Sequence, residues 1–308
     1  MGKLAEDRGN GVRQQVIDTA ANMVTWYSGV SSFTDAESIP RGIISISEAG
    51  LPIDLLNSDI GSDTTVVIFH GAVEPASQLP VLSGQGLSTD VGANRIFISD
   101  PSLYMSDQLR LGWFAGNKEQ PTLQLHIERI IRRIVASHGS RRIVFFGGSG
   151  GGFASLFFSS RFPGSAAIVF NPQTNIAQYQ RSSVMDYARL AFSVPSDTED
   201  PLSRLPHPPV TDLRDVCREP ATGPVVYIQN LNDKFHVENH MQPFLNAIHP
   251  ESPVFLLQDA WGSGHAPPPK SLLTEVLAGV CAVPNWPDDV ADVLDYVQSA
   301  SFKAGTLP

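Results

Sequence analysis

A serine flanked by glycines is the residue best suited to chemistry in this sequence. Residues 147–151 read Gly-Gly-Ser-Gly-Gly, so Ser149 has a glycine two positions before it and two after. A strand pattern precedes this segment and a helical pattern follows it. A serine on such a strand-to-helix turn points its hydroxyl into a cleft, and only small neighbours let the turn close. The pattern predicts that Ser149 is a nucleophile at a helix N-terminus, where backbone N–H groups favour negative charge.

A glycine-rich run of this kind has other common uses. A flexible linker is disfavoured because no polar spacer separates the run from the apolar patterns on either side. A phosphate-binding turn is disfavoured because no Gly-Lys-Ser/Thr follows the run. A purely structural glycine turn is the remaining alternative to the nucleophile.

A serine hydroxyl needs an adjacent base, and that base needs an acid to orient it. For a nucleophile on this kind of turn, the expected chain order is Ser, then Asp or Glu, then His. Asp233 comes shortly after an apolar strand pattern at 225–229, and His265 lies in a glycine-containing loop after the pattern at 254–258. Active sites of α/β proteins assemble at the carboxyl ends of strands. We therefore predict a catalytic triad of Ser149, Asp233 and His265.

Other titratable residues compete for these roles. Asp259 lies on the same loop as the proposed base and is the alternative acid. We expect His236, His240 and His249 to be surface or helix-capping residues. His236 and His240 are four positions apart and could share a metal ion, but only Glu238 lies between them and no other ligand cluster is apparent. We accordingly predict neither a metal nor an organic cofactor.

Acyl transfer also needs backbone N–H groups that point at the carbonyl oxygen as it becomes charged. The N–H of Gly150, next to the nucleophile, is one candidate. The second should come from the loop after the strand pattern at 64–69, which reads His-Gly-Ala-Val over residues 70–73.

Taken together, these motifs resemble the α/β-hydrolase superfamily over about residues 42–285. The resemblance implies that Ala72 supplies the second oxyanion N–H and that His70 braces its loop. It also implies a cap or lid inserted at about residues 173–223. The sequence departs from the superfamily pattern at residues 75–93, which leave little room for the usual first helix.

The alternation of strand and helix patterns predicts an α/β fold with a mainly parallel, eight-stranded sheet flanked by helices. We expect residues 1–41 to form a leader with a helix at 12–26, and residues 42–308 to form one domain that includes the lid insertion. The expected strands are 42–48, 51–56, 64–69, 95–99, 141–146, 166–170, 225–229 and 254–258. The other expected helices are 120–138, 151–162, 184–192, 241–248 and 271–280.

Large aromatic residues occur in loops that should border the site. Tyr104, Trp113 and Phe114 lie in the loop after the strand pattern at 95–99, and Trp261 precedes the proposed base by four residues. They are either packing residues or a surface that binds a sugar or an acyl group. Their pattern faintly resembles that of α/β-hydrolase-like proteins from bacterial surface-polysaccharide systems.

The predicted function is a serine esterase or deacylase that acts through an acyl-enzyme on Ser149. The substrate would be a small-molecule or saccharide ester. One alternative is an acyltransferase that uses the same triad and passes the acyl group to a sugar or another alcohol. The other is a catalytically inactive hydrolase fold that serves as a binding or accessory protein.

The composition limits which partners and which cellular compartment are expected for the protein. The 308 residues include 31 acidic and 21 Lys or Arg side chains, so the net charge is −10, and a nucleic-acid partner is not expected. No apolar run approaches the roughly 20 residues that span a membrane. The polar segment 1–11 does not resemble a signal peptide, and the two cysteines cannot form a disulfide scaffold. We expect a cytoplasmic protein, and the sequence predicts no oligomeric state.

Overall fold

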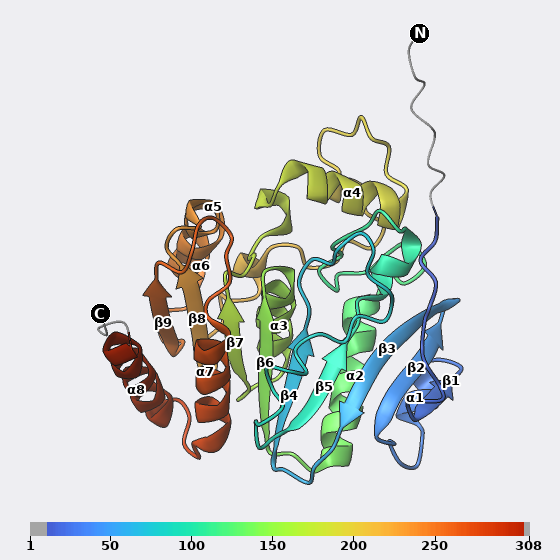
Figure 1. Cartoon of the computed structure of the whole chain (residues 1–308). Coiled ribbons are helices and arrows are strands. Elements are labelled where there is room, and N and C mark those ends of the chain that lie inside the picture. The colour runs from blue at the N-terminus through green and yellow to red at the C-terminus, as the bar shows by residue number, and fades with distance from the viewer. Residues whose placement is uncertain (1–10, 305–308) are drawn as a thin grey trace.

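The computed structural model describes residues 11–304, so the first ten residues of the predicted 1–41 leader and the last four of the predicted 42–308 domain lie outside it. Within these described residues, nine strands form one sheet in the order β1-β2-β3-β5-β4-β6-β7-β8-β9 (Figure 1). The strands are β1 (Val24–Tyr27), β2 (Gly42–Glu48), β3 (Leu51–Ser58), β4 (Thr64–Phe69), β5 (Asn94–Ile98), β6 (Arg142–Gly148), β7 (Ala166–Phe170), β8 (Val225–Asn230) and β9 (Val254–Asp259). Only β3 pairs antiparallel with its neighbours, which confirms the expected mainly parallel sheet.

The ninth strand corrects the prediction for the leader. The helix expected at 12–26 is absent, and Val24–Tyr27 instead pairs in parallel with β2 at the edge of the sheet. Upstream of β1, Gln15 forms a β-bridge with Leu79, and its amide donates to Asp54 at 2.8 Å. Strand formation is favoured here because the Val-Thr-Trp-Tyr segment is β-branched and aromatic throughout.

Eight α-helices occur in the described part of the chain, and most of them flank the sheet. They are α1 (Val30–Thr34), α2 (Leu123–His138), α3 (Gly150–Arg161), α4 (Arg181–Phe192), α5 (Lys234–His236), α6 (Gln242–Ala247), α7 (Lys270–Ala282) and α8 (Asp288–Ala304). The five expected helices downstream of the leader correspond to α2, α3, α4, α6 and α7. The sequence analysis missed α8, although Val290, Leu294 and Val297 form a buried stripe at helical spacing.

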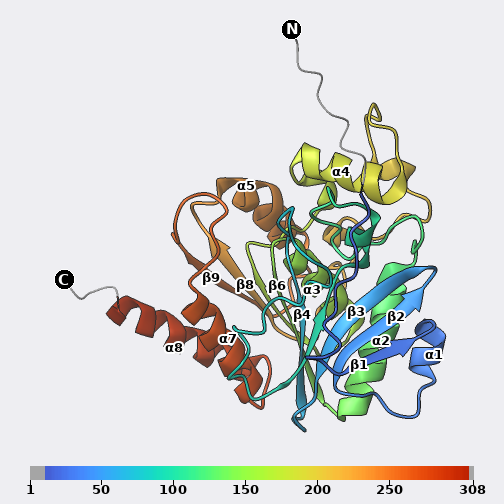
Figure 2. The ribbon, with the colours of Figure 1, turned by 45° about the vertical axis from the view of Figure 1, so that its right-hand side comes forward.

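The two faces of the sheet are covered by different helices (Figures 1 and 2). On β4, Val67 and Phe69 belong to a core cluster that includes side chains of α2 and α3. Val66 and Ile68 belong to a second cluster, completed by α7 and α8. This alternation follows from the period of two along a strand, and burial on both faces explains why β4 reads as a continuous apolar run.

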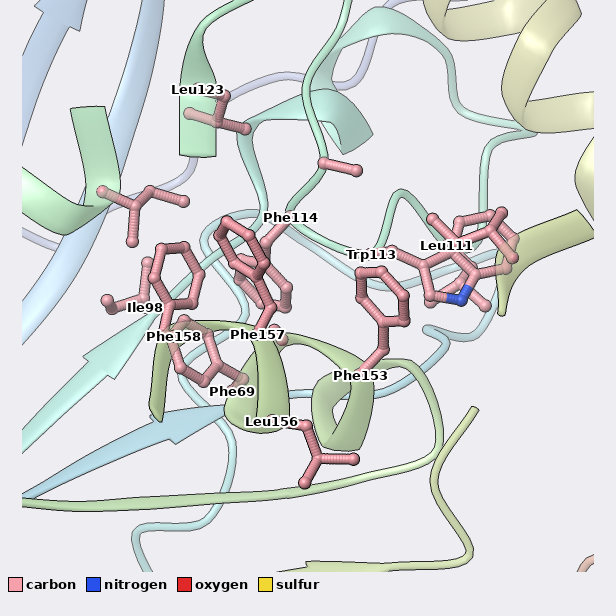
Figure 3. Close-up of a cluster of buried hydrophobic side chains, with 14 of the residues drawn as sticks. Phe69, Ile98, Leu111, Trp113, Phe114, Leu123, Phe153, Leu156, Phe157 and Phe158 are labelled. Carbon is pink, nitrogen blue, oxygen red and sulfur yellow. The ribbon is translucent and has the colours of Figure 1, made fainter. Parts of the chain in front are cut away.

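Aromatic packing fixes the carboxyl end of β4, which leads into the 70–73 loop (Figure 3). The ring of Phe69 stacks on Phe158 of α3, with centroids 5.1 Å apart, and meets Phe114 edge-on at 4.9 Å. Full burial of one such ring contributes roughly 1.5–3 kcal/mol. The end of β4 and helix α3 are thereby held as one rigid support.

Two irregular segments border the carboxyl end of the sheet. Residues 75–93 contain no helix, in line with the short connection noted in the sequence. The segment 173–223, predicted as a lid, contains α4 and three short 3₁₀ turns (Ile176–Gln178, Leu202–Arg204 and Leu213–Asp215). Figure 1 shows α4 at the end of the sheet where α5 follows β8. No helix within the described residues is both long and apolar enough to cross a membrane.

Candidate active site

Ser149 occupies the sharp turn between β6 and α3. Its backbone has φ 55° and ψ −121°, a conformation that costs a non-glycine residue about 1–3 kcal/mol. Hydrogen bonds hold the turn, because Ser149 N donates to Phe170 O and Gln173 N donates to Ser149 O, both at 3.1 Å. A Cβ on Gly151 would lie 2.3 Å from the carbonyl oxygen of Phe69, so no larger residue fits there.

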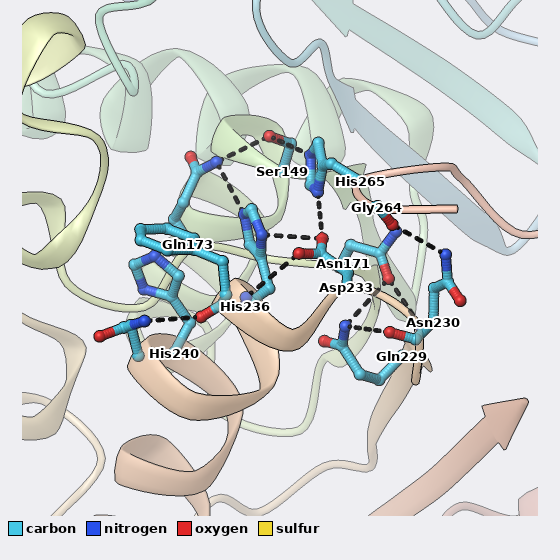
Figure 4. A network of polar contacts seen from close by, with 12 residues as sticks. Ser149, Asn171, Gln173, Gln229, Asn230, Asp233, His236, His240, Gly264 and His265 are labelled. Atoms are coloured by element: carbon cyan, nitrogen blue, oxygen red, sulfur yellow. Dashed lines mark hydrogen bonds and ion pairs between the residues drawn. The ribbon is translucent and has the colours of Figure 1, made fainter. Parts of the chain in front are cut away.

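The three residues predicted as a triad lie in contact (Figure 4). His265 Nε2 lies 3.1 Å from Ser149 Oγ, and His265 Nδ1 lies 2.5 Å from Asp233 Oδ2. Asp233 is buried, Ser149 is half-buried and His265 is exposed. Asp259, the alternative acid, instead accepts a hydrogen bond from Ala260 N at 2.7 Å.

The side chain of Asn230, the last residue of β8, holds the loop that presents His265. Its Nδ2 donates to the carbonyl oxygens of Trp261 at 2.8 Å and Gly264 at 3.1 Å, and its Oδ1 accepts from Trp261 N at 3.0 Å. Asn171, which follows β7, donates to Ala266 O at 2.9 Å on the same loop. The sequence analysis missed both asparagines, although each lies at the end of a strand.

Two backbone N–H groups beside Ser149 have no partner among the described residues. They belong to Gly150 and Ala72, and neither donates a hydrogen bond to another described group. Gly150 opens α3, and the first N–H groups of a helix lack intrahelical acceptors. A Cβ built on Gly71 would lie 3.5 Å from Ser149 Cβ, so the 70–73 loop lies directly beside the serine.

The loop that carries Ala72 is braced from both sides. Val73 N donates to Arg110 O at 2.8 Å, and Arg110 Nε donates to Val73 O at 2.9 Å. His70 is buried, and its Nε2 accepts from Asp100 N at 3.0 Å. Burial lowers the pKa of His70, which keeps the ring neutral and able to accept this bond.

Comparison with solved structures identifies this architecture. The capsule O-acetyltransferase of Neisseria meningitidis serogroup A superposes with a TM-score of 0.52 and 14% identity, covering 82% of this chain and 96% of that chain. An S-formylglutathione hydrolase from Agrobacterium tumefaciens gives a TM-score of 0.54 and 12% identity, over 82% and 95% of the two chains. Est1E from Butyrivibrio proteoclasticus gives a TM-score of 0.50 and 13% identity, covering 81% of this chain and 99% of that chain. The protein has the α/β-hydrolase fold.

The similarity to other proteins is found in structure and not in sequence. No protein-family model matches this chain, and no curated protein sequence matches it either. At 12–14% identity, the similarity to the solved structures establishes the fold and leaves the reaction to the chemistry of the site.

One polar residue that the sequence analysis missed contacts Ser149. Gln173 lies fully buried just beyond β7, and its Nε2 donates to Ser149 Oγ at 2.7 Å. Its Oε1 accepts from Trp113 Nε1 at 2.9 Å. Position after a strand, the signal that identified Asp233, would also have selected Gln173.

The expectation that His236 is a surface or helix-capping residue is wrong, because it is buried and its side chain makes no cap hydrogen bond. His236 is only 2% exposed, and its ring stacks on that of His265, with centroids 4.0 Å apart. His236 Nδ1 lies 2.8 Å from Asp233 Oδ2, although this contact is poorly aligned for a hydrogen bond. Gln173 Nε2 lies 3.3 Å from His236 Nε2. A closed ring of polar contacts therefore links five side chains, namely Ser149, His265, Asp233, His236 and Gln173.

The charges in this ring are set by burial and by mutual contact. Burial, followed by the proximity of His265, lowers the pKa of His236 to about 4, so His236 is neutral near pH 7. His240, also predicted at the surface, is fully buried, and burial lowers its pKa to about 3. Burial alone would raise the pKa of Asp233, but the hydrogen bond from His265 and the contact with His236 bring it below its usual value.

The aromatic residues expected near the substrate occupy several different places. Trp113 is buried and contacts Gln173 through its indole N–H, and Phe114 packs in the core against Phe69. Tyr104 is buried, and its hydroxyl donates to Asp54 Oδ2 at 2.5 Å. The ring of Trp261 is partly buried against the core cluster that contains α7.

The side chains that lie close enough together to be possible metal ligands differ from the His236 and His240 pair considered in the sequence. Ligand atoms of Asp233, His236 and His265 all lie within 4.8 Å of one another, whereas His240 does not belong to this group. In the hydrolase fold, however, these atoms already contact each other, and His265 Nε2 faces Ser149 Oγ. The donor set therefore fits a proton relay better than an open metal site.

Proposed function

We propose that the protein cleaves carboxylic esters by acyl transfer through Ser149. One observation carries this proposal: the chain of contacts from Ser149 Oγ to His265 Nε2 at 3.1 Å and from His265 Nδ1 to Asp233 Oδ2 at 2.5 Å. Serine, histidine and aspartate in this order form the arrangement that activates a hydroxyl. The unpartnered N–H groups of Gly150 and Ala72 add donors for an oxyanion.

The proposed cycle moves one proton at each step. His265 Nε2 takes the proton of Ser149 as Oγ attacks the ester carbonyl carbon, and the N–H groups of Gly150 and Ala72 stabilise the oxyanion. His265 then gives this proton to the departing alcohol, which leaves an acyl group on Oγ. Water attacks next, its proton passes through His265 to Ser149 Oγ, and the carboxylic acid departs. Asp233 holds His265 in the tautomer with the proton on Nδ1.

The cavity beside Ser149 is suited to an uncharged part of the substrate. It has a volume of about 340 Å³, and its wall includes Ile68, Leu87, Phe146 and Phe170 beside the catalytic serine and histidine. Among the residues that the structure describes, no Asp, Glu, Lys or Arg lines it. Because a buried charge without a partner is costly, an uncharged acyl or alcohol group is the substrate part that fits this cavity.

Transfer of the acyl group to an alcohol is the second candidate reaction. It is favoured by a polar pocket that lies beside the cavity at Ser149. Ala72 lines both cavities, and the second, of about 270 Å³, is lined by Arg110, Tyr179, Ser182 and Asp186 among others. Such side chains suit a hydroxylated acceptor. The capsule O-acetyltransferase among the structural neighbours has the same fold.

Turnover of short p-nitrophenyl esters tests the proposed function. Wild type should release nitrophenol with burst kinetics or steady turnover, and Ser149→Ala should reduce the rate to the uncatalysed background. Addition of glycerol or a monosaccharide then separates the reactions, since a transferase forms the new ester and a hydrolase forms only free acid. If wild type is inactive on esters of several chain lengths and resists fluorophosphonate labelling, the protein is instead an inactive binding or accessory member of this fold.

A further inference from the structure

The amide of Gln173 has a fixed orientation that presents a donor to the nucleophile. The indole N–H of Trp113 can only donate, so the atom 2.9 Å from it must be the amide oxygen of Gln173. The amide nitrogen consequently faces Ser149 Oγ at 2.7 Å and His236 Nε2 at 3.3 Å. An NH₂ group has two protons, and these two acceptors account for both.

The neutral state of His236 completes this assignment. With a pKa near 4, His236 carries one ring proton near pH 7, and Nδ1 faces the carboxylate of Asp233 at 2.8 Å. Its Nε2 is then a free acceptor for Gln173. Because Ser149 Oγ accepts from Gln173, the single proton of its hydroxyl is directed to His265 Nε2. Trp113 and His236 are therefore positioning residues that hold the Gln173 amide at its oxygen and at its nitrogen. Figure 4 shows the contacts of Gln173 with Ser149 and His236.

We propose that Gln173 is a catalytic residue that speeds release of the acyl group from Ser149. This inference rests on the proposed function. During deacylation, water loses a proton to His265 and attacks the acyl carbon, the bond from that carbon to Ser149 Oγ breaks, and His265 returns the proton to Oγ. Negative charge builds on Oγ as this bond breaks. A donor 2.7 Å from Oγ in the resting enzyme is placed to stabilise that charge.

The same hydrogen bond has a smaller effect on acylation. In that step Oγ is the attacking atom, and a donated hydrogen bond withdraws electron density from it while also stabilising the charge left by its departing proton. These two effects oppose each other. Gln173 is therefore expected to act mainly on deacylation, a split between steps that a purely structural role would not produce.

Gln173→Met tests the proposal with p-nitrophenyl acetate, because methionine keeps the length and burial of the side chain and removes the amide. Loss of a hydrogen bond to a charged group corresponds to roughly a 10- to 100-fold lower rate. We expect kcat to fall by that factor, KM to fall with it, and kcat/KM to stay within about threefold of wild type. A burst of nitrophenol and an acetylated protein mass should appear at early times.

Trp113→Phe is the second variant, and it takes the place of Gln173→Met in the test if Gln173→Met does not fold. Phenylalanine keeps an aromatic ring and removes only the indole N–H that orients Gln173. We expect the same pattern with a smaller fall in kcat, since His236 still favours the original amide orientation. Tyr187→Phe is the matched control, because it removes a buried hydrogen bond to Gly116 O beside Trp113 without touching Gln173, and its kinetics should equal those of wild type.

The outcomes separate this inference from the proposed function. If kcat/KM falls in parallel with kcat and no acetylated intermediate accumulates in folded Gln173→Met or Trp113→Phe, Gln173 does not act on the leaving oxygen and the inference is overturned. If wild type itself neither turns over esters nor reacts with a fluorophosphonate, the proposed function fails before Gln173 is in question.

Discussion

The imidazole rings of His236 and His265 stack face to face, with centroids 4.0 Å apart and planes 15° from parallel. Both rings direct Nδ1 at the same oxygen of Asp233, at 2.8 Å and 2.5 Å. His265 is exposed, whereas His236 is buried and neutral near pH 7. The carboxylate of Asp233 thus contacts two histidines in different environments.

The buried histidine predicts a specific loss of stability in acid. The pKa of His236 falls from 6.5 in the unfolded chain to about 4 in the fold. Between these values the unfolded chain binds a proton that the folded chain does not, so stability is complete above pH 6.5 and decreases as the pH falls toward 4. The shift corresponds to at most about 3 kcal/mol.

Urea unfolding of wild type and His236→Phe at pH 7.5, 6 and 5 checks this prediction. Phenylalanine keeps the stacked ring and cannot titrate, so the variant should lose less stability on acidification than wild type. His207→Asn, which removes an exposed histidine on the 173–223 segment, should behave as wild type. Equal pH slopes in His236→Phe and wild type would mean that folding does not lower the pKa of His236.

Asp233 and Asp259 give a clean comparison of the two candidate acids. Asp233→Asn should lower kcat by about 10³- to 10⁴-fold, because an amide at this position favours the wrong tautomer of His265. Asp259→Asn should change kcat by less than about twofold, since its carboxylate accepts from the N–H of Ala260 and makes no hydrogen bond to His265 among the described residues. Ester turnover with matched protein concentrations measures both. A large effect in Asp259→Asn would reverse the assignment.

The proposed oxyanion donor at Ala72 is tested by removing its N–H. Ala72→Pro lacks that donor and should lower kcat by about 10²- to 10³-fold. Ala72→Ser keeps the N–H at an exposed position and should stay close to wild type. Fluorophosphonate labelling rates and circular dichroism are measured alongside, so that a collapsed loop is distinguished from a lost donor. Full activity in folded Ala72→Pro would exclude Ala72 as a donor.

The close packing of the turn predicts that Gly151 tolerates no side chain. A Cβ there would lie 2.3 Å from Phe69 O and 2.7 Å from His70 O, and backbone cannot yield as a side chain does. Gly151→Ala should lose at least about 1–3 kcal/mol of stability and most of its activity. Gly92→Ala is the control, because a Cβ at Gly92 meets nothing within 4 Å. Thermal unfolding and ester turnover of both variants measure the difference.

Local patterns were sufficient to predict eight of the nine strands in the described residues and the positions of Ser149, Asp233 and His265 at the ends of strands. A buried parallel strand is a continuous apolar run, and the residues after such strands converge at one edge of the sheet. The helix expected at 12–26 was wrong because its apolar spacing fits a helix, whereas pairing with β2 and with Leu79 decides the outcome. That pairing is a long-range contact with no local signal.

The roles of Gln173 and His236 were not predictable in the same way. The amide of Gln173 presents a donor to Ser149 because Trp113, 60 residues upstream, and His236, on another element, fix its orientation. His236 was expected to be a surface or helix-capping residue, because His265 follows the last strand pattern in a glycine-containing loop and was preferred as the base. Its burial depends on stacking against His265, which lies on a different loop.

Covalent capture of Ser149 tests the central claim most directly. Intact-mass analysis of wild type after treatment with a fluorophosphonate should show one added phosphonyl group, and peptide mapping should locate it on Ser149. Ser149→Ala should take up none, and Asp233→Asn should react far more slowly than wild type. A folded wild-type protein that stays unmodified, or a modification at another residue that persists in Ser149→Ala, would contradict the account.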